Sequence, residues 1–356
     1  MRNIAMLIVP FFLLGGIFYS IRRRSKIFWG DLSYKSILFI TLAVLLFIVA
    51  IFFCMRGDIL GFSSKTLDII GSIGMRITTL LLLSIPFLLL EHLISKRYQI
   101  PRYYTIAVIL TIFGFGFYNT QNTIITTINI ESNKIQQDTK ILFVSDTHVN
   151  NIFHTKHLET IKKEIKNQNP DFVVIAGDLL DGVKSEYVPA FTTLQNIGVP
   201  IYATLGNHDS MGEVHISEEI GNISDVQILR NESVEESWLQ IIGIDDRSIR
   251  NWKSLEEILA KSNIQDEGKF TIFVTHQPIA LSKLTQYPID LQLAGHTHKG
   301  QNIFVMPLAI TMNDYFYGRY DEGDRTAIVS QGIGTRGLPF RLGSQSEIMI
   351  INLQKK

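Results

Sequence analysis

Short apolar runs, rich in β-branched residues, alternate with polar clusters along the second half of the chain. Runs of this length and composition are typical of buried strands. The first runs are separated by a helical pattern over residues 157–165. This alternation of strand, helix and strand predicts a layered α/β domain. The runs that carry the prediction cover residues 141–144, 172–176, 201–205, 270–274 and 291–294.

A polar cluster follows each of these runs. The carboxyl ends of strands are where α/β sheets gather their functional loops, so the clusters are expected to converge. Together they hold enough oxygen and imidazole donors to bind two metal ions side by side. In chain order the clusters are Asp146-Thr147-His148, Gly177-Asp178-Leu179-Leu180-Asp181, Gly206-Asn207-His208-Asp209, Thr275-His276-Gln277-Pro278 and Gly295-His296-Thr297-His298.

The first half of the chain has a different pattern, with long apolar segments at residues 4–21, 37–54, 77–90 and 103–118, of which the third reaches the length of a membrane span if it extends to Ile94. A membrane-spanning helix needs roughly 20 such residues, and the last segment fits that length only marginally. Arg22, Arg23 and Arg24 follow the first segment where a signal peptide would have a small-residue cleavage site. The sequence therefore predicts an all-α, multi-pass membrane region of about four helices over residues 1–118. A separate α/β domain is expected over residues 122–356.

The charges of the loops predict an orientation in the membrane. The loops after the first and third apolar segments carry more Lys and Arg residues than the loops on the alternate side. Basic loops remain in the cytoplasm. With four spanning helices, the protein is expected in the plasma (inner) membrane with its second half outside the cytoplasm. One more strand is predicted at residues 123–130 and no long linker precedes Asp146, so this half should lie close to the bilayer.

Charge and cysteine content restrict the possible partners. The 33 Lys and Arg residues balance the 33 Asp and Glu residues, so there is no basic excess and no nucleic-acid partner is expected. Cys54 is the single cysteine and lies within an apolar segment. It cannot form a disulfide within the chain, and no thiolate is available to the predicted metal site.

The residue types of the clusters indicate hydrolysis at phosphorus. Asp178 is the natural bridge between two cations, since a carboxylate can offset part of their repulsion. Imidazole and amide oxygen ligands without sulfur suit Mn, Fe or Zn, with Mn favoured. Two such ions make hydroxide available near neutral pH and hold both sides of an in-line displacement. His208 is the expected general acid, and either Asp181 or Asp209 could orient it.

Each cluster alone is weak evidence, because Asp-x-His or Gly-Asn-His tripeptides are also common in turns. All five in this order, each after an apolar strand, favour the functional interpretation. The remaining histidines of this half lack such a setting, and His154 and His157 are predicted to be surface residues.

With these motifs, residues 122–356 resemble the calcineurin-like metallophosphoesterases, and most closely their membrane-associated bacterial branch. The resemblance implies a four-layer α/β/β/α sandwich with a dimetal centre. It implies Asp181 as the partner of the acid His208. Lys299 departs from the pattern, because this branch usually has glycine after the last histidine. The implied ligands are Asp146, His148, Asp178 and His298 for the first metal, and Asp178, Asn207, His276 and His296 for the second.

The leading hypothesis is a membrane-anchored, metal-dependent phosphoesterase that hydrolyses a phosphate mono- or diester. A lipid or envelope headgroup is a candidate substrate, and membrane lipids are candidate partners. Lys299, Arg336 and Arg341 are candidates for binding an anionic substrate. The aromatic run at residues 315–317 either holds a lipid chain or packs in a turn. The alternative function is a membrane receptor whose phosphoesterase fold binds a phosphorylated ligand; transport is less favoured, because the first two apolar segments contain no charges.

Overall fold

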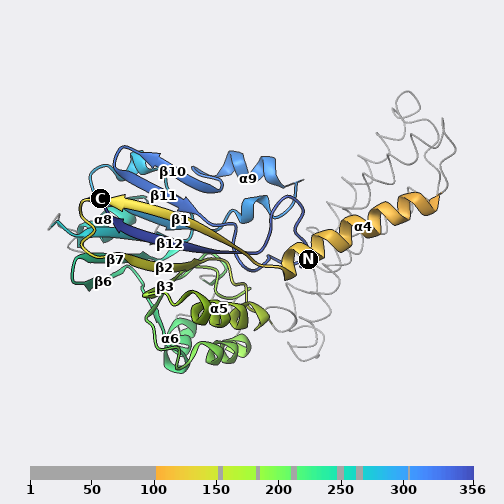
Figure 1. The fold of residues 1–356 in the computed structure, drawn as a ribbon, viewed down its shortest axis with the longest axis horizontal. Helices are drawn as coiled ribbons and strands as arrows, with labels where there is room; N and C mark the ends of the chain where they lie inside the picture. Colours follow the sequence, from red (N-terminus) through yellow and green to blue (C-terminus); the bar gives the residue numbers. More distant parts are fainter. Residues whose placement is uncertain are drawn as a thin grey trace, which may run out of the picture. The chain divides into compact units, whose positions relative to one another are not determined.

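The apolar runs become strands of two six-stranded mixed sheets (Figure 1). The computed structural model describes residues 102–150, 155–181, 185–209, 215–246, 252–261, 268–303 and 305–356. In spatial order, the first sheet contains β1 (Ile124–Ser132), β12 (Glu347–Lys355), β2 (Thr139–Val144), β3 (Phe172–Ala176), β4 (Ile201–Thr204) and β5 (Val226–Ile228). The second contains β10 (Gly318–Glu322), β11 (Arg325–Val329), β9 (Leu291–Ala294), β8 (Phe270–Thr275), β7 (Leu239–Ile244) and β6 (Glu232–Glu236).

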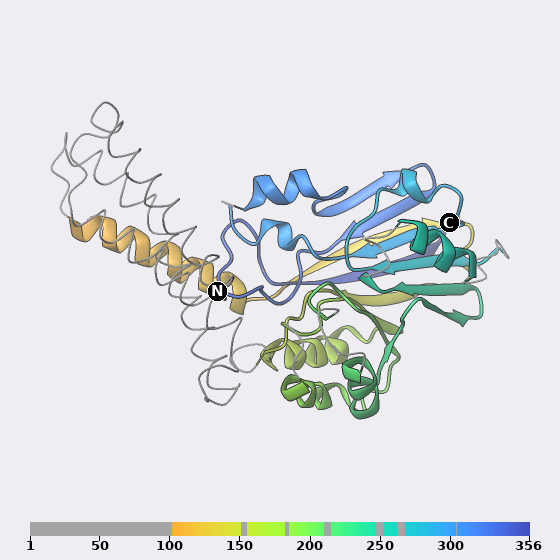
Figure 2. The same ribbon diagram turned by 180° about the vertical axis from the view of Figure 1, so that it is seen from behind.

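The two sheets pack face to face, and helices cover their outer faces. Buried side chains such as Phe143, Val174 and Ile272 fill the space between the sheets. On the outer face of the first sheet lie α5 (Thr155–Gln168), the 3₁₀ helix η2 (Ser185–Leu194) and α6 (His215–Ile223). On that of the second lie α8 (Trp252–Lys261) and η4 (Leu281–Leu284). In both views α5 and α6 lie together on one side of the strands (Figure 1 and Figure 2). The predicted α/β fold, built on two mixed sheets, is confirmed.

Parallel pairing brings the polar clusters to one edge of each sheet. In the first sheet β2, β3 and β4 run parallel to one another. In the second, β7, β8 and β9 do the same. Because parallel strands end at the same edge, the loops that follow them meet there. The short helices η5 (His298–Gly300) and α9 (Met306–Met312) continue from the loop after β9.

The fourth predicted span is a helix, but its last turns contact the α/β domain. This helix, α4, covers Arg102–Gln121. Asn119 Nδ2 donates to the carbonyl oxygen of Arg341 over 3.1 Å, and Arg341 N donates to the carbonyl oxygen of Gly116 over 3.0 Å. Within the described residues, no helix has both the length and the apolar character that crossing a membrane requires. The first three predicted spans lie outside the described residues.

The prediction that His157 is a surface residue is wrong, since its exposed fraction is only 6 %. It lies on the buried face of α5 with Leu158, Ile161 and Ile165. Residues 157, 161 and 165 are four apart, so a helix places them on one face. His154 lies outside the described residues.

Candidate metal centre

The turn after β2 holds Asp146 and His148 in the left-handed backbone region, at φ values of 55° and 42°. Asp178, His296 and His298 share this conformation, at 51°, 71° and 49°. Non-glycine residues with positive φ are uncommon, and such strain concentrates at functional sites. Here it occurs at five of the predicted metal ligands, in loops that follow β2, β3 and β9.

Hydrogen bonds and close backbone approach fix the Asp146 carboxylate. Ser145 Oγ donates to Asp146 Oδ2 over 2.5 Å, and His296 N donates to the same oxygen over 3.1 Å. A Cβ atom at Gly295 would collide with Ser145 and Asp146, and one at Gly332 would collide with the Asp146 side chain. Glycine is thus required where these loops pass the carboxylate.

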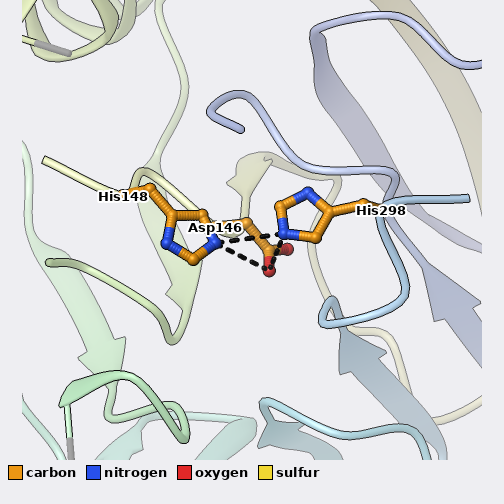
Figure 3. A group of neighbouring side chains, drawn as sticks. All are labelled: Asp146, His148 and His298. Atoms are coloured by element: carbon orange, nitrogen blue, oxygen red, sulfur yellow. Dashed lines mark hydrogen bonds and ion pairs between the residues drawn. The ribbon is translucent and has the colours of Figure 1, made fainter. Parts of the chain in front are cut away.

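Asp146, His148 and His298 form the first cluster of donor atoms (Figure 3). The Nε2 atoms of the two histidines face each other across 3.0 Å. His298 Nε2 lies 3.4 Å from Asp146 Oδ1, and His148 Nε2 lies 4.0 Å from it. Neutral imidazoles would direct the lone pairs of both Nε2 atoms toward the space beside Asp146 Oδ1. A cation bound there would accept both lone pairs, as expected of a metal site.

Asp178 connects this cluster to a second one that contains His276. Asp178 Oδ2 lies 3.6 Å from His148 Nε2 and 3.1 Å from His276 Nε2. His296 Nδ1 lies 3.2 Å from His276 Nε2, and Asp146 belongs to the second cluster as well. Asn207 is buried and precedes His208, whose backbone N–H donates to Asp178 Oδ1 over 2.9 Å. The side chains of six predicted ligands therefore come together around Asp178: Asp146, His148, Asp178, His276, His296 and His298.

Two carboxylates could orient His208, and their contacts distinguish them. Asp181 Oδ1 lies 3.7 Å from His208 Nδ1, and Asn150 Nδ2 donates to Asp181 Oδ2 over 3.3 Å. Asp209 instead accepts backbone N–H bonds from Leu179, Leu180 and Gly206. The geometry favours Asp181 as the partner of His208. The hydrogen bonds of Asp209 connect the loop after β3 to the loop after β4.

Burial and mutual charge control the protonation of the cluster. Burial raises the pKa of Asp146. Burial would also raise the pKa of Asp178, but the neighbouring charge of His276 lowers it below the usual range. Burial lowers the pKa of His298 well below its usual value, and that of His296 to about 3. Ionised Asp178 and neutral His296 and His298 are the forms that bind a cation.

Of the three predicted anion-binding residues, Lys299 and Arg336 border the site. Lys299 Nζ lies 4.3 Å from the centroid of the Tyr317 ring, within cation–π distance. Arg336 is exposed. Burial is the main cause of the lowered pKa of His208, and the charge of Arg336 also lowers it.

Arg341 requires a correction, because its side chain is fully enclosed and cannot meet a substrate. Its guanidinium donates to the carbonyl oxygen of Gly332 over 2.9 Å, to that of Gly334, and to Ser344 Oγ over 3.2 Å. Nη2 also lies 3.5 Å from His298 Nδ1. Arg341 therefore fixes the loop behind His298.

Sequence reasoning missed several supporting residues. Ser145 and Asn150 flank the Asp-x-His motif, so their positions beside the ligands were the available signal. Gln277 Nε2 donates to Asp246 Oδ1 over 2.6 Å and joins the loop after β8 to the one after β7. Tyr317 donates to the buried Glu347 over 2.9 Å, which favours turn packing for the aromatic run. Nothing in the sequence pairs Gln277 with Asp246 or Tyr317 with Glu347.

Comparison with known proteins identifies the family. A family model described as calcineurin-like phosphoesterase matches residues 139–300. A metallophosphoesterase of Helicobacter pylori (strain J99) is 30 % identical over 279 residues, which cover 75 % of each chain. The chain belongs to the calcineurin-like metallophosphoesterase family. This confirms the resemblance to the family, whose members are hydrolases of phosphoric esters.

Two further metallophosphoesterases show how much of each relative is matched. One from Campylobacter jejuni is 29 % identical over 238 residues, which cover 65 % of this chain and 63 % of that protein. A zebrafish (Danio rerio) relative named "Transmembrane protein with metallophosphoesterase domain" is 32 % identical over 234 residues, 61 % of this chain and 53 % of its own length. The match covers less than two thirds of the length of each of these two relatives.

Proposed function

We propose that this metallophosphoesterase hydrolyses a phosphate mono- or diester with two divalent metal ions. The observation that carries the proposal is the position of Asp178 Oδ2, within 3.6 Å of His148 Nε2 and 3.1 Å of His276 Nε2. A carboxylate between two clusters of N and O donors is what a bridging ligand requires. We assign Asp146, His148, Asp178 and His298 to one ion, and Asp178, Asn207, His276 and His296 to the other. Because every one of these positions carries a ligand, the receptor alternative has no support from lost ligands.

The bound ions supply Lewis acidity and an activated water for attack at phosphorus. The chain's own residues complete the reaction. His208 gives a proton to the leaving oxygen as its bond to phosphorus breaks. Asp181, beside His208 Nδ1, keeps the imidazole aimed at the site. Lys299 and Arg336 add positive charge at the border, where a phosphate enters.

Metal removal tests this function directly. We expect a thoroughly chelated sample to lose hydrolysis of an aryl phosphate, and added Mn²⁺ to restore it best, because the ligands are all nitrogen and oxygen. Metal analysis of the purified protein should give about two ions per chain. Undiminished activity in the metal-free protein would refute the proposal.

We further propose that the enzyme is anchored in the plasma (inner) membrane with its catalytic domain outside the cytoplasm, where a lipid or envelope headgroup is the substrate. The apolar segments and the basic loops of the sequence support this, as does the printed name of the zebrafish relative. The side depends on the number of crossings, because an odd number places the domain in the cytoplasm. Alkaline phosphatase fused after Lys356 should be active. An inactive phosphatase fusion, together with a fluorescent fusion of a protein that fluoresces only in the cytoplasm, would show that the catalytic domain lies in the cytoplasm.

A further inference from the structure

Five large apolar side chains near and on α9 form an apolar ridge on the surface: Ile303, Val305, Leu308, Ile310 and Met312. These side chains are exposed by 44 % to 72 %, and α9 buries none of its residues. Scattered exposed apolar residues are ordinary, but a contiguous group of large ones is typical of an interaction surface.

The apolar ridge begins at the metal centre. Gly300, two residues after His298, has a φ of 75°, and a Cβ atom there would collide with the backbone of Met306. Met306 N also donates to the carbonyl oxygen of Asn302 over 3.1 Å. The first turn of α9 is therefore fixed against the loop that carries His298. Whatever covers the ridge therefore lies next to the loop that carries His298.

The charge pattern suggests what covers it. Residues 300–313 contain no charged side chain. At the border of the ridge lie Lys299 and Arg336, and the backbone N–H of Arg336 donates to Gln301 Oε1 over 3.0 Å. An apolar surface with a basic border fits a lipid bilayer, because the apolar side chains enter the acyl region while the cations meet phosphate headgroups.

The helix α4, which exposes large apolar side chains, contacts the same edge of the domain as the ridge. Leu342 N donates to the carbonyl oxygen of Gln301, at the start of the ridge, and Arg341 N donates to that of Gly116, in α4, each over 3.0 Å. Residues 341–342 thus connect the ridge to α4. On α4, Ile106 and Leu110 are exposed by 56 % and 65 %. The sequence before α4 contains the apolar segments 4–21, 37–54 and 77–90.

From these features we infer that the apolar ridge rests in the surface of a lipid bilayer, and that the metal centre acts on phosphate esters carried by lipids in that surface. The inference rests on the proposed phosphoesterase function and adds to it the contact surface and the route of the substrate. Lys299 and Arg336 then lie at the level of the headgroups.

A fluorescent probe on the ridge tests the contact without depending on activity. In the full chain, Cys54→Ser removes the single cysteine, and Leu308→Cys carries an environment-sensitive dye. Lys166→Cys, at an exposed position of α5 on the outer face of the first sheet, is the matched control. The protein is reconstituted in vesicles of phosphatidylethanolamine and phosphatidylglycerol with nitroxide-labelled acyl chains. The dye at position 308 should be quenched by the lipid nitroxide. The dye at position 166 should be quenched by aqueous iodide and not by the lipid nitroxide.

The other possible occupants of the ridge give different results. A dye at 308 that is shielded from both quenchers is covered by protein, either a second copy or the chain's own first 101 residues. A dye quenched by iodide alone is in water. Either result overturns the inference.

A matched pair of substrates tests the route. One is a soluble aryl phosphate monoester, and the other is the same ester with a long alkyl chain on its ring, presented in the vesicles. We expect kcat/KM to be about tenfold higher for the alkylated ester, and Leu308→Glu to abolish this preference while leaving the soluble ester unaffected. Equal rates on both esters overturn the inference. If neither ester is hydrolysed, the proposed function fails, while the probe still reports the contact.

Discussion

At the residue scale, His208 and Asp178 separate proton transfer from metal binding. We predict that His208→Ala lowers turnover by about 10²–10⁴-fold and leaves metal content nearly unchanged, because the side chain pairs with Asp181 and only its backbone N–H contacts Asp178. Asp178→Asn is the matched contrast and should lose both metal and activity. Turnover and metal content per chain are measured for each variant.

The leaving group provides a further check on His208. An ester with a very acidic leaving group needs no protonation, so it should rescue His208→Ala more than a poor leaving group does. Loss of metal from His208→Ala would show that the residue is a ligand and that the acid has been misassigned.

His157 predicts a pH dependence of stability. Burial, with a smaller contribution from the charge of Arg341, lowers the pKa of His157 to about 3 from its ordinary 6.5. Below pH 6.5 the unfolded chain binds a proton that the folded chain does not, so stability falls between pH 6.5 and about 3. The slope from this residue approaches about 1.4 kcal/mol per pH unit.

The His157 contribution is isolated by substitution. In detergent, urea unfolding of the full chain should show a shallower acid slope for His157→Gln than for wild type. Lys163→Gln, at an exposed position of the same helix, does not titrate in this range and is the control. Identical slopes for His157→Gln and wild type would mean that His157 is protonated in the folded protein.

The positions of the candidate ligands could be predicted from sequence, whereas the burial of His157 and Arg341 could not. A ligand such as Asp146 or Asp178 follows its strand directly, so local pattern and parallel pairing locate it. The role of Arg341 depends on the carbonyl groups of Gly332 and Gly334, which only the folded loop places around its guanidinium. An arginine in a loop therefore suggested a substrate contact that burial excludes.

At the scale of elements, the loop after β11 supports the metal centre from behind. Gly332, in this loop, has a φ of 78°, and a Cβ atom there would collide with the Asp146 side chain. We predict that Gly332→Ala lowers metal content and activity, because Asp146 must shift. Gly323, in the turn between β10 and β11, has a φ of 63° and open space around it.

Gly323→Ala is the matched control for that prediction. It carries the same kind of backbone strain, about 1–2 kcal/mol, without any collision at the site. Metal content and activity should therefore remain at the wild-type level, while stability falls. Equal metal loss in both variants would assign the effect to general destabilisation instead.

Elements were predictable where burial on both faces gives a continuous apolar run. The predicted strand 172–176 coincides with β3, and the run 291–294 coincides with β9. By contrast, β6 and β10 consist largely of polar and charged residues, ESVEE and GRYDE, and form the outer strands of the second sheet. Edge strands are stabilised by pairing with a neighbour, so their own sequence carries little strand signal.

At the scale of the whole molecule, the candidate metal centre joins the two sheets. Asp146, His148 and Asp178 follow strands of the first sheet, whereas His276, His296 and His298 follow strands of the second. Metal ions bound by ligands from both sheets would connect the loops of one sheet to the loops of the other. The unfolded chain has no such site. Metal binding should therefore stabilise the fold of the whole catalytic half.

The size of this stabilisation follows from mass action. Free Mn²⁺ at about 100 times its dissociation constant should raise the free energy of unfolding by about 2.7 kcal/mol for each site filled. The melting temperature and the urea unfolding curve of the full chain are measured in detergent, once with chelator and once with added Mn²⁺. They give the difference in stability between the metal-free and the metal-bound protein. Asp178→Asn, compared with and without metal, should show almost none of it, because both clusters share this carboxylate. A wild-type melting temperature that is the same in chelator and in Mn²⁺ would mean that the ions do not link the two sheets.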